Sequence, residues 1–516
     1  MAEHLITLGT GPPSITEVVA VARHGFQVRL SPEAETAITS ARAVVDSLAG
    51  QDVAHYGIST GFGALATTHI RPERRGALQR SLIRSHAAGS GPEVETEVIR
   101  ALALLRLSTL ATGHTGVRPQ TARAYADLLN AGVTPVVREY GSLGCSGDLA
   151  PLAHVALALL AEGTVRTRDG ETIPAAEALA RAGLAPIELA EKEGLALING
   201  TDGMLGMLTL ALHDLAVLAT TADIAAAMSV EALLGTDAAF AGDLQALRPH
   251  PGQADSAANL RVLLADSPIM AGHRDPAACT RIQDAYSLRC APQVHGALRD
   301  TAAHARLVAE RELAAAIDNP VIATDGRVAS NGNFHGAPVG YVLDFLAVAV
   351  ADTASMSERR TDRALDAGRN QGLPPFLAHE VGVDSGLMIA QYTAAGIVAE
   401  LKRLAVPASA DSIPSSAMQE DHVSMGWAAG RKLRRAIDGL RQVVAIELLT
   451  AARALDLRGP LSPAPATAAV RDTLRTAGVS GPGPDEPLSA QIDIAVGAVA
   501  DGSVLAAAEE VTGPLH

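Results

Sequence analysis

The stretch GSLGCSGDLAPLAH, residues 141–154, runs from a series of small residues directly into the start of a helix. Glycine and serine allow tight turns that larger side chains resist. Asp148 stands where an N-cap is favourable, and Pro151 is well tolerated in a first helical turn. The pattern by itself predicts a loop followed by a helix that continues through the apolar residues to position 161.

The tripeptide Cys145-Ser146-Gly147 permits a second, chemical interpretation. In a tight turn the Gly147 nitrogen can attack the Cys145 carbonyl, because glycine has no Cβ to obstruct the approach. Ring closure and loss of the Ser146 hydroxyl as water leave an exocyclic methylidene, whereas position 145 contributes only its carbonyl. The product, 4-methylidene-imidazol-5-one, is a strong electrophile formed autocatalytically by the chain, so no external cofactor is required.

Composition restricts the class of protein. The 516 residues carry a formal net charge of -15 and only 3% aromatic residues, which argues against a nucleic-acid-binding surface. The cysteines, Cys145, Cys279 and Cys290, have no metal-ligand spacing, so we expect no metal site and a reducing, cytoplasmic location. The first residues lack a basic, apolar leader, and charged residues interrupt the long apolar runs, so neither a signal peptide nor a membrane span is expected.

Hydrophobic periodicity predicts a mainly α protein. Apolar residues recur at helical spacing, often on more than one face, in the expected helices 75–86, 92–111, 119–131, 204–234, 287–316, 339–365, 388–404 and 421–455. Long helices that are apolar on several faces need neighbours on several sides, which predicts a bundle and subunit contacts. We therefore expect a smaller, loop-rich N-terminal domain at 1–200, bearing the electrophile loop, and a long-helix bundle with the C-terminal domain at 201–516.

The stretch 141–154 resembles the signature loop of the aromatic amino-acid ammonia-lyases, whose usual triad is Ala-Ser-Gly. Cys145 takes the alanine place, outside the ring, and the departure is expected to be tolerated. The resemblance covers nearly the whole chain, from Leu5 to about Leu455. It implies a homotetramer in which neighbouring chains share active sites.

Two further motifs carry the resemblance in the N-terminal part. The run YGISTGFG, residues 56–63, resembles the loop that bears the family's catalytic base, which implies this role for Tyr56, although Ser59 replaces a common asparagine. On local grounds alone a loop tyrosine is a packing residue. His86 ends a predicted helix, where a histidine is favourable. In the family a histidine at this place is similar to the substrate-ring contact of the histidine and tyrosine lyases.

Other motifs resemble the substrate-binding segments. Asn199, in the turn LINGT, matches an asparagine that faces the substrate and the electrophile, although Asp202 stands where many relatives have glutamine. The run QDAYSLRCAPQ, residues 283–293, resembles the carboxylate-binding stretch almost residue for residue. The resemblance implies that Gln283, Tyr286 and Arg289 bind substrate, with Arg289 holding the carboxylate through a bidentate fork.

The last two motifs bear on the substrate. Phe334, in the turn NGNFHG, matches a phenylalanine that packs over the active site. The run SSAMQEDHVSM, residues 415–425, has the local pattern of an acidic helix N-terminus. It also resembles the histidine-specific version of a family motif that elsewhere contains Asn-Gln-Asp. A carboxylate at Glu420, next to Gln419, suits an imidazole that can carry positive charge.

The resemblance implies elimination of ammonia from L-histidine, giving trans-urocanate, a step in histidine degradation. Glu420, Tyr56 and the Cys145-Ser146-Gly147 group are the expected catalytic residues. A tyrosine ammonia-lyase or aminomutase built on the same loop is the alternative, and a helical scaffold that has lost catalysis is another. Pyridoxal phosphate chemistry is disfavoured, because none of the three lysines, Lys192, Lys402 and Lys432, lies in a loop resembling a Schiff-base site.

Overall fold

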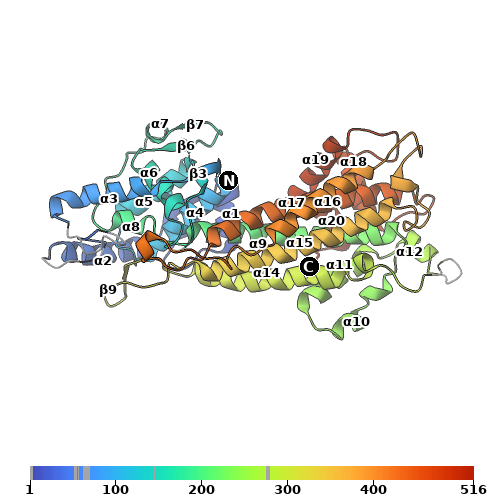
Figure 1. Cartoon of the computed structure of the whole chain (residues 1–516), viewed down its shortest axis with the longest axis horizontal. Helices are drawn as coiled ribbons and strands as arrows, with labels where there is room; N and C mark the ends of the chain where they lie inside the picture. Colours follow the sequence, from blue (N-terminus) through green and yellow to red (C-terminus); the bar gives the residue numbers. More distant parts are fainter. Residues whose placement is uncertain are drawn as a thin grey trace. The chain divides into compact units, whose positions relative to one another are not determined.

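The computed structural model describes residues 4–51, 55, 57–61, 70–144, 146–274, 279 and 281–516, and the structural statements below concern these. The fold is mainly α, as predicted (Figure 1). The chain divides into two compact units, each described here by itself. The first comprises Met1–His213, Ala305–Asp344 and Pro407–Arg431, and the second comprises Asp214–His304, Phe345–Val406 and Lys432–His516. The domain division expected at residue 200 stays a prediction.

The first unit combines short strands with medium-length helices. Its elements are β1(Leu5–Leu8), α1(Ile15–His24), β2(Gln27–Leu30), α2(Pro32–Ala49), α3(Pro72–His86), β3(Ser90–Glu93), α4(Thr96–Ala111), α5(Pro119–Asn130), β4(Thr134–Pro135), β5(Arg138–Tyr140), α6(Leu149–Leu159), β6(Thr164–Arg166), β7(Thr172–Pro174), α7(Ala175–Arg181), α8(Glu193–Ala196), β8(Val321–Ile322), β9(Val328–Ala329) and η4(Ser416–Met418). Among the described strands, β1 and β2 pair in parallel, whereas β3–β5, β4–β6–β7 and β8–β9 pair antiparallel.

Helix α4 forms the core of the first unit. Every residue from Val98 to Ala111 is buried, and α4 packs against α1, α2 and α5. A helix that is apolar on all sides requires this central position. Arg100 and Arg106 are the charged residues in this buried stretch, so each needs partners inside the protein.

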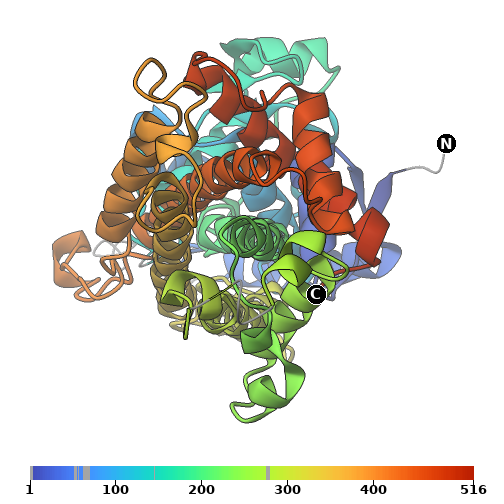
Figure 2. The same cartoon turned by 90° about the vertical axis from the view of Figure 1, so that its right-hand side faces the viewer.

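The second unit is a bundle of long helices. Its elements are η2(Ala238–Phe240), α10(Gly242–Ala246), α11(Pro251–Leu263), α12(Pro268–Gly272), α13(Tyr286–Arg289), η3(Pro375–Leu377), α16(Met388–Leu404), α18(Pro465–Ala477), α19(Leu488–Ala500) and α20(Ser503–Thr512), with the larger parts of α9(Asp202–Ala232), α15(Ala337–Leu365) and α17(Gly426–Asp456) and part of α14(Ala291–Leu313). In the end-on view of Figure 2, α9 in green lies among the other helices of this unit. Its buried residues occupy all faces.

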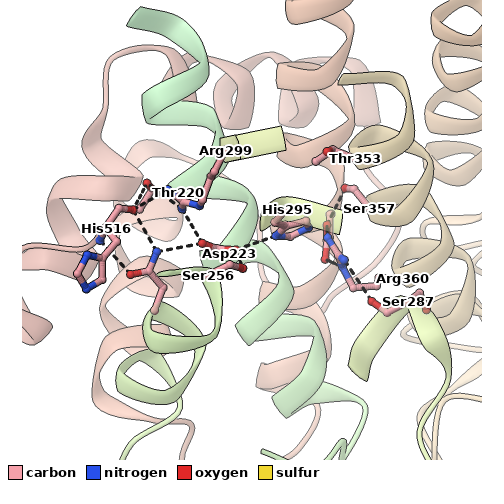
Figure 3. A network of polar contacts seen from close by, with 12 residues as sticks. Thr220, Asp223, Ser256, Ser287, His295, Arg299, Thr353, Ser357, Arg360 and His516 are labelled. Carbon is pink, nitrogen blue, oxygen red and sulfur yellow. Dashed lines mark hydrogen bonds and ion pairs between the residues drawn. The ribbon is translucent and has the colours of Figure 1, made fainter. Parts of the chain in front are cut away.

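Buried charges tie the helices of this bundle together. Asp223 of α9 accepts a hydrogen bond from Ser256 of α11 at 2.5 Å, and it pairs with His295 and Arg299 of α14, each at 2.7 Å (Figure 3). These contacts hold the pKa of Asp223 below its usual range, against the effect of burial. Because a buried carboxylate needs such compensation, the network fixes how these three helices pack.

Two helices, α9 and α15, are long and apolar enough to cross a membrane by length and composition, and α19 with α20 would be a third if the bent pair counted as one span. Within the most apolar window, 83% of the residues of α9 and 61% of those of α15 are buried inside the protein. Packing in a protein core therefore accounts for most of this apolar character. The absence of a membrane span stays a prediction.

Several predicted helix bounds are shifted by the structure, and three of the differences have a clear physical reason. Helix α4 begins at Thr96 and not at 92, because Pro92 lies in strand β3, which pairs with β5. The predicted helix 287–316 is two helices, α13 and α14, since Pro292 has no N–H to continue the ladder across Cys290. Helix α17 begins at Gly426 and not at 421, after Met425 in a left-handed conformation with φ of 52°.

Candidate active site

The loop 141–148 is held tightly against the turn 199–201. Gly147 is buried and has φ of 79°, which favours glycine. A Cβ placed on Gly147 would collide with the backbone of Gly200, and the Asp148 N–H donates to the Gly200 carbonyl at 2.7 Å. The backbone conformation at Gly147 is therefore unavailable to a larger residue.

Asp148 caps a different helix from the one the sequence suggested. Its carboxylate makes no hydrogen bond to the N-terminus of α6. Instead one oxygen accepts from the N–H groups of Gly203 and Met204, in the first turn of α9, each at 2.9 Å. The other oxygen accepts from the Ser142 hydroxyl at 2.8 Å. Asp148 thus joins the loop to the N-terminus of α9, whose N–H groups and dipole favour its negative charge but do not outweigh the opposing effect of burial.

Stability is expected to depend on pH through Asp148. Burial raises the pKa of this carboxyl to about 7, whereas an aspartate in the unfolded chain titrates near 4. Between these values the folded state holds a proton that the unfolded state has released, so the stability contribution of Asp148 is lost as pH rises through this window. Relative to Asp148→Asn, the parent should lose a few kcal/mol of unfolding free energy between pH 5 and pH 8, at about 1.4 kcal/mol per pKa unit.

Urea unfolding of both proteins at the two pH values measures this difference. A midpoint difference between parent and variant that does not change with pH would contradict the raised pKa.

A second segment, 423–426, is also hydrogen-bonded to the loop. Ser424 donates to the Gly144 carbonyl at 2.8 Å, and the Met425 N–H donates to the Leu143 carbonyl at 2.9 Å. The Gly336 N–H also donates to the Gly144 carbonyl, at 3.1 Å. Segments that are distant in the sequence therefore hold the backbone carbonyls of Leu143 and Gly144.

Ser146 and Glu420 are in direct contact. The Ser146 hydroxyl donates to Glu420 Oε1 at 2.6 Å, and the Ser415 hydroxyl donates to Glu420 Oε2 at 2.8 Å. Both Ser146 and Glu420 are partly exposed. The structure thus brings together two residues that the sequence separates by 274 positions and that were both predicted to be catalytic.

His86 lies close enough to Glu420 for their charges to interact. Burial lowers the pKa of His86, whereas the bond to the Leu82 carbonyl and the Glu420 charge oppose this effect. Nδ1 of His86 lies 2.9 Å from the Leu82 carbonyl oxygen, which can only accept, so Nδ1 carries the proton. In the neutral ring, Nε2 is then an acceptor.

Asn199 is buried, and the guanidinium of Arg106 donates a hydrogen bond to its backbone carbonyl. Its side-chain amide donates to the Asn319 carbonyl at 3.0 Å, and its own carbonyl accepts from Arg106 at 3.0 Å. Arg106 is fully buried, also donates to the Ile317 carbonyl at 2.9 Å, and pairs with Asp202 at 3.4 Å. Burial raises the pKa of the Asp202 carboxyl, and the nearby Arg106 guanidinium offsets only part of this effect.

The remaining predicted residues of the first unit lie on nearby segments. Phe334 is partly buried in the turn before α15, two residues from the Gly336 N–H that bonds the loop. Gln419 is exposed, and its N–H donates to the Ser416 carbonyl at 3.1 Å. Tyr56 and Cys145 lie outside the described residues.

The three predicted carboxylate-binding residues form a cluster of their own in the second unit. Arg289 donates to Gln283 Oε1 at 3.1 Å and to the Asp284 carbonyl at 3.0 Å. Its guanidinium carbon lies 4.7 Å from the centre of the Tyr286 ring, a cation–π contact. Tyr286 is 70% exposed, so the cluster lies at the surface of this unit.

Two residues that matter to the site were missed from the sequence. Arg106 was detectable in principle, because a charge inside the apolar stretch of α4 requires a buried partner. The role of Asp148 was not detectable, because its partners Gly203 and Met204 are reached only through the tertiary fold.

Comparisons with known proteins identify the family of the chain. The family model for aromatic amino acid lyases matches residues 14–476. A histidine ammonia-lyase of Streptomyces coelicolor is 64% identical over 513 residues, covering 99% of this chain and 100% of that protein.

Solved structures show the same fold. The crystal structure of histidine ammonia-lyase from Trypanosoma cruzi has a TM-score of 0.89 and 37% identity, with 98% of this chain and 95% of that chain covered. The tyrosine aminomutase from Streptomyces globisporus has a TM-score of 0.93 and 36% identity, with 99% and 100% covered. From the family match and these identities over its full length, we conclude that the chain belongs to the aromatic amino acid lyase family.

Proposed function

We propose that this chain is a carbon–nitrogen lyase that eliminates ammonia from L-histidine and releases trans-urocanate. The proposal rests mainly on the 64% identity to a histidine ammonia-lyase over essentially the whole length of both chains. The contact between Glu420 and Ser146 supports it, because it places the carboxylate of the histidine-specific motif at the reactive loop. We place the enzyme in the cytoplasm, where its cysteines would stay reduced.

Fold similarity alone does not choose the substrate. The tyrosine aminomutase is as similar in structure as the histidine ammonia-lyase from Trypanosoma cruzi, and their identities to this chain are 36% and 37%. The choice rests on the closer relative and on local chemistry, since Glu420 and His86 together can accept hydrogen bonds from an imidazole. A phenol ring offers one hydroxyl and no second donor.

The residues of the loop fit a self-made 4-methylidene-imidazol-5-one. Gly147 has a left-handed backbone conformation with no room for a Cβ beside Gly200, so the position is restricted to glycine, the residue whose nitrogen is least obstructed for attack. The Ser146 hydroxyl, which must leave, already has a hydrogen-bond partner. When formed from Cys145-Ser146-Gly147, this group supplies an electrophile that makes the substrate amine a good leaving group.

The other residues bind and orient the substrate. Arg289 holds the carboxylate, with Gln283 and Tyr286 fixing its guanidinium, and Asn199 and Phe334 line the substrate position. His86, Gln419 and Glu420 hold the imidazole. Tyr56 removes the β-proton as general base, a role that rests on its motif.

We further propose a homotetramer in which one chain supplies the Arg289 cluster to the Ser146 loop of a neighbour. Exposed apolar side chains on helix faces support association: Tyr341, Phe345 and Val348 on α15 are 58%, 52% and 46% exposed, and Ile389 and Tyr392 on α16 are 54% and 62% exposed. Spacings of three and four residues place each set on one face of its helix. Such faces are buried in assemblies.

Substrate choice is tested with His86→Leu, which replaces the imidazole and its acceptor nitrogen with an apolar side chain. We expect kcat/KM for L-histidine to fall about 10- to 100-fold, the value of one hydrogen bond to a partly charged group. Activity is followed by urocanate absorbance, and L-tyrosine is assayed in parallel with chromatography for the α- and β-amino acids. An unmodified chain that prefers L-tyrosine, or that produces a β-amino acid, would refute the proposal in favour of the aminomutase.

A further inference from the structure

Glu420 is bound to the Ser146 hydroxyl, an atom that the mature enzyme of the proposed function no longer contains. The 2.6 Å hydrogen bond therefore belongs to the chain before the electrophile forms. The contact points to a task for Glu420 during formation of the group.

The segment around Glu420 is built to present this carboxyl. The Ser415 N–H donates to the Glu420 carbonyl at 2.7 Å, and the Glu420 N–H donates back to the Ser415 carbonyl at 3.3 Å. The residues between them, Ser416, Ala417 and Met418, have φ of 50°, 53° and 70°. Consecutive non-glycine residues in the left-handed region are unfavourable and are found mainly where function requires them.

The hydrogen bond from Ser415 fixes the second oxygen of the carboxyl. With Oε2 held by Ser415 at 2.8 Å, Oε1 is directed at Ser146. This leaves the carboxyl with one oxygen for support and one for the reacting hydroxyl. Such an arrangement is typical of a positioned acid or base, which must lie within hydrogen-bond reach of the atom it serves.

Loss of the Ser146 hydroxyl needs such a group. Hydroxide is a poor leaving group, so the oxygen must receive a proton as the Cβ–Oγ bond breaks. We propose that the Glu420 carboxyl delivers this proton and thereby acts as the general acid that completes the electrophile. This inference rests on the proposed function, and it concerns a step that precedes turnover.

The atoms and electrons of the step balance. In the structure Oε1 accepts from the Ser146 hydroxyl, so Glu420 first takes a proton from solvent and then donates through Oε1 to Oγ. A solvent water molecule removes the Ser146 Cα proton, and the electron pair of that C–H bond forms the Cα–Cβ double bond. The Cβ–Oγ bond breaks, and Oγ leaves as water with its own hydrogen and the proton from Glu420. Glu420 ends as the carboxylate that accepts hydrogen bonds in the structure, and the Cα proton passes to solvent in place of the one that Glu420 took up, so there is no net change in Glu420.

The same carboxyl would then serve two stages. Before maturation its Oε1 is occupied by the serine hydroxyl. Departure of that hydroxyl frees Oε1 for the imidazole of the substrate, so the enzyme cannot use Glu420 for substrate until the electrophile is complete.

The variant Glu420→Gln tests this proposal, because the amide keeps the size and the acceptor oxygen of glutamate and cannot deliver the proton. The chains are made by timed cell-free synthesis, and intact mass is measured on the soluble folded protein, with folding checked by circular dichroism. We expect the parent to become lighter by two waters and Glu420→Gln to lose the serine water about 10²- to 10⁴-fold more slowly, the usual contribution of general acid catalysis. The matched control is Asp421→Asn, which neutralises the adjacent, exposed carboxylate and should mature at the parental rate.

Ser415→Ala is the second variant, and it keeps the test decisive if Glu420→Gln does not fold. Removing the support of Oε2 should slow loss of the serine water about tenfold, the value of one charge-assisted hydrogen bond. Maturation of either folded variant at the parental rate would overturn the inference. A parent that is not lighter by two waters would instead show that the electrophile of the proposed function does not form. The mass of the parent by itself therefore distinguishes failure of the proposed function from failure of this inference.

Discussion

Ser146→Ala is expected to abolish ammonia elimination, with kcat reduced by roughly 10³- to 10⁶-fold, as for loss of a covalent catalytic group. Alanine has no hydroxyl to eliminate, so the exocyclic methylidene cannot form. The fold should persist, because Ser146 is partly exposed and its side chain makes one hydrogen bond within the part of the chain that the structure describes, to Glu420. Hydrogen bonds of other segments with the backbone of Leu143, Gly144 and Asp148 hold the loop independently of this side chain. Activity and intact mass are measured on the same preparation.

The control for this variant is Ser40→Ala, which removes an exposed hydroxyl of α2 that bonds only within its helix, to the Thr36 carbonyl at 2.9 Å. It should keep full activity and remain lighter than its calculated mass by two waters. Full activity in Ser146→Ala, or a parent mass that equals the calculated mass, would contradict the role of Ser146.

Arg289→Ala should be inactive for a different reason, since it removes the fork that we propose binds the substrate carboxylate. The electrophile should still form, so this variant should be lighter than its own calculated mass by two waters, as the parent is. When Ser146→Ala and Arg289→Ala chains are refolded together, a site shared between chains would in some cases combine an intact Ser146 with an intact Arg289. We expect activity to reappear in the mixture.

Each variant refolded alone is the control for this experiment, and mixed assembly is verified with two affinity tags. Only a fraction of the sites can be complete after random mixing, so the readout is recovery against no recovery. A chain that is monomeric by light scattering, or mixed tetramers without activity, would contradict the shared site.

The sequence predicted the helical class and most long helices because their apolar spacing persists over many turns. The predicted helix bounds were wrong where hydrogen bonds between distant backbone segments determine the structure. Pro92 was expected to begin a helix, yet it lies in β3, whose partner β5 is more than forty residues away. Residues 421–425 were expected to be helical, but contacts such as that of the Met425 N–H with the Leu143 carbonyl hold them in another conformation.

The candidate site was predicted as a set of separate motifs, and the structure adds which of them meet. Ser146 and Glu420 were each predicted from their own motif, but nothing in either stretch indicated a direct hydrogen bond between their side chains. The Asp148 carboxylate was expected to cap α6 and instead caps α9. In both cases the decisive partner lies far away in sequence, so local propensity could not reveal it.

The most direct test of the account is the product that the purified, unmodified chain forms from L-histidine. Near-ultraviolet absorbance should rise as trans-urocanate accumulates, with one ammonia released for each urocanate and with no added cofactor. L-Tyrosine and L-phenylalanine under the same conditions should give little or no product. A flat trace with L-histidine from folded protein that is lighter by two waters, or faster turnover of L-tyrosine, would contradict the account.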